Sequence, residues 1–345
     1  MNKTKQFGII AAIAAMISLV PCASAQEGAG AKEGFHLAYD AGAEVVSSYI
    51  WRGQYNGALS FQPDLSVGWD SKYTSFRLGT WWSLGASDWK FTKKWKEGGD
   101  YNPNTYFIPE FDLYANINIL GITAGFTHYY YFGNSNYFSG GEINKVMAAG
   151  NTSQTEVSVG YDFETLLGIP LKVSWNMMVS GADGYLKNPE VITEDEEGNP
   201  MDVEDWYIDG TYKRAYSSYI EIAYTHTFEA IGLSLTGTLG FSPWKSMYTD
   251  MNWLEVKFDR DGNVVYDSEG KPVIIDNGKS WAINNLAIRI EKEWEIGDKC
   301  SLNLFAVGSL NTCNCLKKYT VIDGAGDDKL YKQKLNGCIG LGVWF

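Results

Sequence analysis

The chain ends in Leu335-Asn336-Gly337-Cys338-Ile339-Gly340-Leu341-Gly342-Val343-Trp344-Phe345, a stretch that alternates with a period of two. One face of the predicted strand is apolar and carries Leu335, Ile339, Leu341, Val343 and Phe345. The other face is small or mixed and carries Asn336, Cys338, Gly340, Gly342 and Trp344. A strand with an oily face and a small or polar face is typical of a barrel wall between lipid and a wet lumen. The stretch therefore predicts the closing strand of an outer-membrane β-barrel.

The beginning of the chain is consistent with export. Lys3 and Lys5 precede an uncharged apolar stretch, 7–20, and Ala23-Ser24-Ala25 is a small-x-small cleavage site. This pattern predicts a signal peptide over 1–25, too short for a membrane-spanning helix. A lipoprotein signal at Cys22 is the alternative, which Pro21 disfavours. We expect a periplasmic N-terminal lead over 26–36 and a single barrel domain over 37–345, located in the cell outer membrane.

Composition supports the same class of protein. Removing Lys3 and Lys5 takes the formal charge from −13 to −15, which argues against nucleic acid as a partner. Aromatic residues are abundant at 15%, yet the chain has no long apolar run after the signal. A transmembrane barrel dilutes its hydrophobic signal in this way because every second residue of a strand faces the lumen.

Segments of clean alternation recur along the chain, and we predict twelve antiparallel strands from them. They span 37–52, 61–70, 74–84, 106–118, 121–132, 153–164, 169–180, 216–228, 231–241, 281–294, 300–310 and 335–345. The connections alternate strictly between tight turns and longer loops, as periplasmic turns and extracellular loops do in barrels with an even strand number. Outward aromatic residues near the strand ends predict interfacial girdles, with Trp51, Trp82, Phe107, Phe132 and Phe241 at the loop end. Trp69, Phe163, Phe228, Trp294 and Phe345 mark the turn end.

Many inward positions are charged, which predicts a polar passage with a transverse field. We expect Arg52 and Asp64 near the extracellular mouth, and Arg77, Lys172 and Arg289 lower in the lumen. The complete set of predicted pore-lining residues is Glu44, Arg52, Asp64, Arg77, Glu110, Asp112, Lys172, Glu221, Arg289 and Glu291. The alternative is that these charges pair and plug the lumen, because twelve strands lie between side-chain-filled and open barrels.

Catalytic, metal and cofactor sites find little support. His128 and His226 are predicted to face outward, but neither has an outward serine two residues away, so no nucleophile–base pair is evident. The acidic segment 189–209 favours a solvated loop over a calcium site, and 259–263 with 267–270 is typical of ribbon turns. We predict no cofactor and no metal site. Cys300, Cys313, Cys315 and Cys338 permit disulfides without specifying a pair.

One stretch resembles a known family. Ser48-Tyr49-Ile50-Trp51-Arg52-Gly53, Phe61-Gln62-Pro63 and Gly79-Thr80-Trp81-Trp82-Ser83 are similar to the opening hairpins of the uncharacterised Gcw_chp family of exported bacterial barrels. The resemblance covers about the first fifty barrel residues and implies the architecture, but no substrate or catalytic residue. The terminal Phe345 likewise resembles the signal by which the outer-membrane assembly machinery recognises its clients.

These observations predict a passive outer-membrane channel for small hydrophilic solutes, with outer-membrane lipid and lipopolysaccharide and the assembly machinery as partners. A sealed barrel that binds a ligand or partner through its surface loops is the second hypothesis. An outer-membrane lipid hydrolase is the third, and we expect no enzymatic activity.

Overall fold

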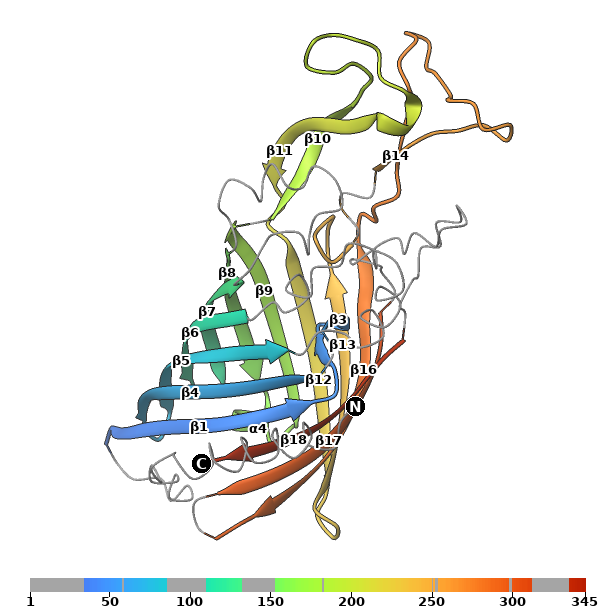
Figure 1. Ribbon diagram of the computed structural model, residues 1–345. Helices are drawn as coiled ribbons and strands as arrows, with labels where there is room; N and C mark the ends of the chain where they lie inside the picture. The colour runs from blue at the N-terminus through green and yellow to red at the C-terminus, as the bar shows by residue number, and fades with distance from the viewer. Residues whose placement is uncertain are drawn as a thin grey trace, which may run out of the picture.

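The computed structural model describes residues 34–57, 59–85, 110–131, 153–181, 183–249, 251, 254–297, 300–311 and 335–345. Its strands form one closed antiparallel barrel (Figure 1). The order around the barrel is β1-β18-β17-β16-β13-β12-β9-β8-β7-β6-β5-β4, and β4 pairs with β1 to complete the ring. The predicted fold class and strand number are both confirmed.

The twelve wall strands are mostly ten or eleven residues long, the length needed to cross a bilayer at a tilt. Their bounds are β1 His36–Val46, β4 Ser60–Asp70, β5 Thr74–Gly85, β6 Glu110–Ile119, β7 Ile122–Tyr131, β8 Ser153–Asp162, β9 Leu171–Gly181, β12 Ser218–Phe228, β13 Leu233–Ser242, β16 Ala282–Glu295, β17 Ser301–Leu310 and β18 Leu335–Trp344.

The two faces of the wall differ as the alternation predicted. Leu335, Ile339 and Leu341 are exposed on the outer face of β18, whereas Asn336 and Cys338 are buried on its inner face. Exposed apolar residues recur on the outside of the other strands, and most buried side chains are polar. All backbone groups of the wall can pair around a closed ladder, so this apolar belt suits a hydrocarbon environment. The chain is an outer-membrane barrel.

The predicted alternation of connections is also confirmed wherever the structure describes it. Tight connections follow β4, β6, β8, β12 and β16, and a one-turn helix, α4 (Glu164–Leu167), lies in the connection after β8. The longer connections carry ribbons beyond the barrel end, β10 (Gly184–Ile192) with β11 (Tyr207–Arg214) and β14 (Leu254–Val256) with β15 (Ile274–Asp276) (Figure 1). The segments 259–263 and 267–270 form the expected ribbon turns.

Helices contribute little to the part of the chain that the structure describes. Besides α4 there is a short 3-10 helix, η3 (Val203–Asp205). None of the helices within the described ranges is long and apolar enough to cross a membrane.

Two predictions about strand geometry were wrong. The first strand does not run from 37 to 52 but ends at Val46, and a separate hairpin follows, β2 (Tyr49–Trp51) with β3 (Gln54–Gly57). A β-bulge also interrupts β9 between Met178 and Ser180, which pair with Glu156 and Thr155 on β8. The bulge shifts the alternation of inward and outward side chains. The alternation predicted over 169–180 directs Met178 and Ser180 to the same inward face, but Ser180 beyond the bulge is exposed, whereas Met178 stays buried.

Candidate functional site

The β2–β3 hairpin folds into the barrel instead of extending its wall. The Tyr49 ring lies 5.4 Å from the Trp81 ring on β5, and the Trp51 ring lies 5.8 Å from the Tyr129 ring on β7. At the hairpin tip, Asn336 on β18 donates a hydrogen bond to the carbonyl oxygen of Gly53 at 2.7 Å. The hairpin therefore crosses the lumen from β1 and touches strands on several sides. Trp51, predicted to belong to the outer girdle, is a lumenal residue.

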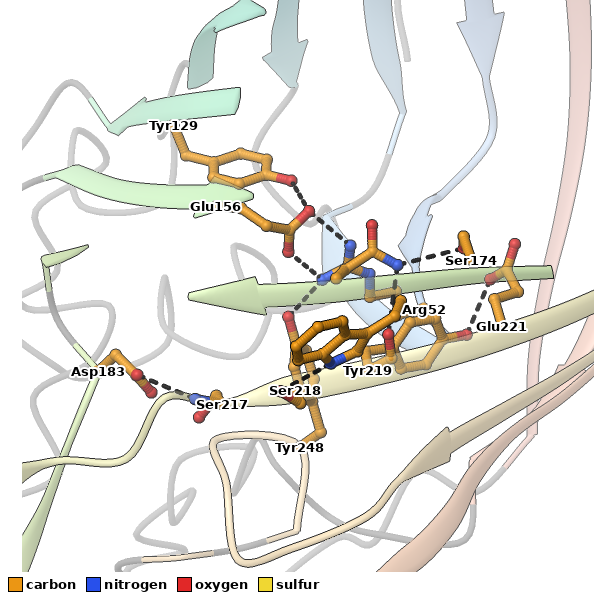
Figure 2. A network of polar contacts seen from close by, with 12 residues as sticks. Arg52, Tyr129, Glu156, Ser174, Asp183, Ser217, Ser218, Tyr219, Glu221 and Tyr248 are labelled. Carbon is orange, nitrogen blue, oxygen red and sulfur yellow. Dashed lines mark hydrogen bonds and ion pairs between the residues drawn. The ribbon is translucent and has the colours of Figure 1, made fainter. Parts of the chain in front are cut away.

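Arg52 occupies the hairpin turn, with φ of +51° followed by Gly53 at +79°. Its guanidinium donates to both carboxylate oxygens of Glu156 on β8, at 2.6 and 2.8 Å, and also to the Tyr248 hydroxyl (Figure 2). The Tyr129 hydroxyl donates to the same carboxylate at 3.1 Å. The prediction that Arg52 lies on the wall beside Asp64 was wrong, because the turn moves the side chain across the lumen.

Aromatic rings surround this ion pair. The Arg52 guanidinium carbon lies 4.5 Å from the centroid of Trp51 and 4.8 Å from that of Tyr219 on β12. Tyr248 comes from the segment after β13 and is fully buried, with its ring 5.7 Å from Trp51. Figure 2 shows Arg52 between Glu156 on one side and Tyr219 and Tyr248 on the other. A guanidinium between ring faces and a carboxylate is stabilised by cation–π and charge-assisted contacts.

A chamber of about 580 Å³ lies beside the hairpin, within the wall formed by β1, β4–β7 and β18. Tyr49 and Trp51 of the hairpin line it, as do Arg77 and Asp40 nearer the short-turn end of their strands. Its remaining lining residues are Asp64, Ser66, Trp81, Asp112, Tyr114, Asn116, Thr127, Tyr129 and Trp344. The chamber is thus bounded by the hairpin and by six neighbouring wall strands, and it combines aromatic rings with carboxyl groups.

Inward glycines let two of these rings lie against the wall. A Cβ atom on Gly79 would approach Cζ of Tyr114 to 2.4 Å, and one on Gly42 would approach the Trp344 ring to 2.1 Å. Both glycines are paired directly across the ladder with the residue whose ring covers them. Small residues opposite large ones are the usual way in which a barrel interior is filled. The two rings lie over the glycines, where side chains of larger residues would otherwise be, and the chamber beside them stays open.

Charge in the chamber is unequally balanced. Arg77 contacts Asp40 and donates to both carboxylate oxygens of Asp70, at 2.7 and 2.8 Å, so two acids already engage it. Asp64, in the middle of β4 and not near the mouth as predicted, accepts a hydrogen bond from the Tyr114 hydroxyl at 2.7 Å. Asp112 is 7% exposed, and its Oδ1 atom has no hydrogen-bond partner among the described residues. The chamber therefore carries a surplus of carboxyl groups.

The other predicted pore-lining residues lie elsewhere in the lumen. Arg289 pairs with Glu291 at 2.8 Å and approaches Glu44 to 3.8 Å, and its guanidinium lies 3.7 Å from the centroid of the Phe305 ring. Three further predicted residues have separate positions: Glu110 is buried on β6, Glu221 accepts from the Tyr219 hydroxyl at 2.9 Å, and Lys172 pairs with Asp162 at 3.0 Å with its side chain largely exposed. Seven of the ten residues thus belong to the Arg52 ion pair, the chamber or a cluster around Arg289, and Glu110, Glu221 and Lys172 lie apart from these three.

Residues that the prediction missed complete the site. Glu156 has the correct inward parity but was absent from the predicted pore-lining set, and Tyr114, Trp81 and Tyr129 are lumenal by the same parity. Alternation alone could have assigned these four to the lumen. Tyr248 lies in a connection, and no periodicity in the sequence could place it there.

Groups that would suggest catalysis or metal binding are sparse. Nδ1 of His128 lies 3.0 Å from the Thr155 hydroxyl, and the His226 ring contacts Phe228 edge-on. Within the ranges that the structure describes, no group of three or more His, Cys, Asp or Glu side chains could hold a metal ion. Cys300 and Cys338 are free thiols, and Cys338 pairs across the ladder with Val307. Cys313, Cys315, Phe107, Phe132 and the signal peptide lie outside the described residues.

Comparisons with known proteins show structural similarity to solved barrels but do not assign the chain to a family. No family model and no curated protein matches the chain, so the resemblance to the Gcw_chp family remains a prediction. Among solved structures, the COG4313 outer-membrane channel from Pseudomonas putida F1 is similar with a TM-score of 0.38 and 12% identity, covering 92% of this chain and 99% of that one. The NanC porin has a TM-score of 0.34 and 10% identity, with 89% and 99% covered.

The outer-membrane phospholipase of Salmonella typhi is a third similar structure, with a TM-score of 0.29 and 8% identity over 89% of each chain. At these TM-scores the structural similarity does not indicate a function. Function is therefore inferred from this chain's own residues.

Proposed function

We propose that the protein is an outer-membrane channel for small hydrophilic solutes, with the β2–β3 hairpin as its constriction. The observation that carries the proposal is the polar interior. Among the described residues, buried polar and charged side chains outnumber buried apolar ones, and Val46, Phe305 and Cys338 form a small buried apolar cluster. An interior of this kind holds water, and a wet lumen is the first requirement for solute passage.

The position of the hairpin across the lumen favours a narrow, selective channel over a wide pore. Its tip is held by hydrogen bonds and an ion pair, at Arg52 and Gly53, instead of by a packed apolar core. The chamber beside the hairpin provides space of molecular size within the wall. Charged and aromatic groups at a narrow point act on solutes through size, dipole and charge.

A sealed barrel is the second candidate, and one observation favours it. The hairpin reaches from β1 to Glu156 on β8 and to Asn336 on β18, so it bridges the lumen at this level. In this alternative the ribbons β10–β11 and β14–β15 would carry the function through contacts outside the membrane.

Conductance separates the two candidates. We would refold wild-type protein and a variant with residues 48–57 replaced by a short Gly-Ser linker, and record single channels in planar bilayers. The channel predicts discrete openings in wild type and larger ones in the variant. A control with the ribbon turn 260–263 shortened should conduct like wild type. Silence of the wild type together with openings in the hairpin variant would support the sealed barrel, and silence of both would contradict the channel.

A further inference from the structure

The chamber presents more negative than positive charge to anything that enters it. Three carboxyl groups and one guanidinium line it, and that guanidinium, on Arg77, is already engaged by Asp40 and by Asp70. Asp64 and Asp112 have no basic partner among the residues that the structure describes. An anion would therefore be repelled from this part of the lumen, and a cation would be attracted.

Asp112 is the strongest indication of a ligand. Its side chain lines the chamber and is almost completely buried, yet Oδ1 makes no hydrogen bond. A buried polar atom without a partner costs free energy, and a buried charge without a partner costs more. A cationic or hydrogen-bonding group placed in the chamber would offset this cost at Asp112.

The rings of the chamber favour a cation over other polar ligands. Six aromatic side chains line it, from the hairpin and from four wall strands: Tyr49, Trp51, Trp81, Tyr114, Tyr129 and Trp344. The faces of such rings carry negative potential and attract ammonium groups, most strongly where water is excluded. A sugar can also stack on rings and donate hydroxyl hydrogen bonds to carboxyl groups, but it carries no positive charge to balance their surplus.

The protein itself shows how this lumen holds a cation. The Arg52 guanidinium pairs with Glu156 and lies beside Tyr219 and Tyr248 (Figure 2). It also lies against the Trp51 ring. Trp51 and Tyr129 are shared between that cage and the chamber. The chamber therefore repeats the combination of ring faces and carboxyl groups that already stabilises one buried cation.

We propose that the chamber binds a small organic cation, an amine or quaternary ammonium compound, between its aromatic rings and the carboxyl groups of Asp64 and Asp112. This assignment deepens the proposed function and rests on it, because the ligand reaches the chamber through the lumen. A volume of about 580 Å³ lies within the range of small-molecule sites and excludes a long polymer from the chamber.

Binding can be measured without ion flow, on the full-length mature protein in detergent. We would titrate choline, with 3,3-dimethylbutan-1-ol as its uncharged isostere, and follow heat and the tryptophan fluorescence of the lining rings. Choline is expected to bind at least about tenfold more tightly than the isostere. Asp112→Asn and Asp64→Asn should each weaken choline binding by about tenfold, because each removes a carboxyl group of the chamber that would pair with the ammonium. Asp261→Asn, on a ribbon turn outside the barrel, should leave affinity unchanged.

Several results would overturn the assignment. They are equal affinity for choline and the isostere, no binding of either, choline affinity unchanged in both lumenal variants, and binding of glucose or maltose in preference to choline. The gel mobility of the unheated, folded barrel verifies that each variant folds, and Asp64→Glu, which keeps the charge, should retain binding where Asp64→Asn loses it. A barrel that binds choline without conducting would contradict the channel proposal but support the binding site. A conducting barrel that does not bind choline would contradict the binding site but support the channel proposal.

Discussion

Arg52 and Glu156 are 104 residues apart in the chain, yet two nitrogen atoms of the guanidinium lie 2.6 and 2.8 Å from the two carboxylate oxygens. The pair joins the tip of an inward hairpin to the opposite wall of the barrel, and both side chains are at least nine-tenths buried. Together with the hydrogen bond from Asn336 to Gly53, the pair holds the hairpin across the lumen.

Removal of one partner should destabilise the barrel. Arg52→Ala leaves Glu156 buried without its cation, and we expect the free energy of unfolding to fall by about 3–5 kcal/mol. Arg52→Ala combined with Glu156→Ala should cost less than the sum of the single changes, since neither charge then remains unpaired. Urea unfolding of protein refolded into vesicles measures both. Arg260→Ala on the exposed ribbon is the control, and additive effects of the two lumenal changes would contradict the coupling.

The glycines beneath the chamber rings should not accept a side chain. Gly79→Ala places a Cβ atom within about 2.4 Å of the Tyr114 ring, which must move, and we expect a loss of about 1–3 kcal/mol. Gly237→Ala is the matched control, because a Cβ atom there meets nothing within 4 Å. Thermal unfolding in detergent compares the two. Equal midpoints for both variants would show that Tyr114 does not depend on Gly79.

Asp183, in the loop after β9, should make the stability of the protein depend on pH. Burial raises the pKa of its carboxyl from the ordinary 3.8, although the Ser217 amide donates to Oδ2 at 3.0 Å. An acid with a raised pKa in the folded state loses stability as pH rises above its ordinary pKa. Asp183→Asn should therefore unfold at a higher temperature than wild type at pH 7, and the difference should vanish at pH values below the ordinary pKa.

Asp195 provides the comparison of opposite sign. Hydrogen bonds from the side chain and backbone of Asn199 lower the pKa of this exposed carboxyl, so its contribution is present at neutral pH and is lost as pH falls. Asp195→Asn should not raise the unfolding temperature at pH 7. A gain in both variants would mean that the effect reflects net charge and not burial at Asp183.

Phe345 is expected to act in assembly. Its backbone amide donates to the carbonyl oxygen of Ala41 at 2.7 Å, next to the seam between β1 and β18. We propose that the assembly machinery recognises this end of the chain. Deletion of Phe345 should reduce the amount of folded barrel in cells several-fold and affect refolding in detergent much less. Leu335→Ala, at the other end of β18, is the control, and equal losses in cells and in detergent would contradict recognition.

The sequence by itself determined the wall of this protein. Alternation with a period of two is local, so it correctly predicted twelve strands and the outward face of β18. Asp64, Arg77 and Asp112, which the same parity directs inward, line the chamber.

Only the tertiary structure decided how the lumen is occupied. Residues 49–52 continue the alternation of the predicted first strand, and the turn at Arg52 that carries them inward is stabilised by Glu156, Tyr248 and Asn336, all more than a hundred residues away. The bulge near Met178 and the buried position of Tyr248 depend equally on distant partners. A local pattern records which face a residue prefers, but the choice between extending the wall and crossing the lumen depends on contacts that exist only after the barrel has closed.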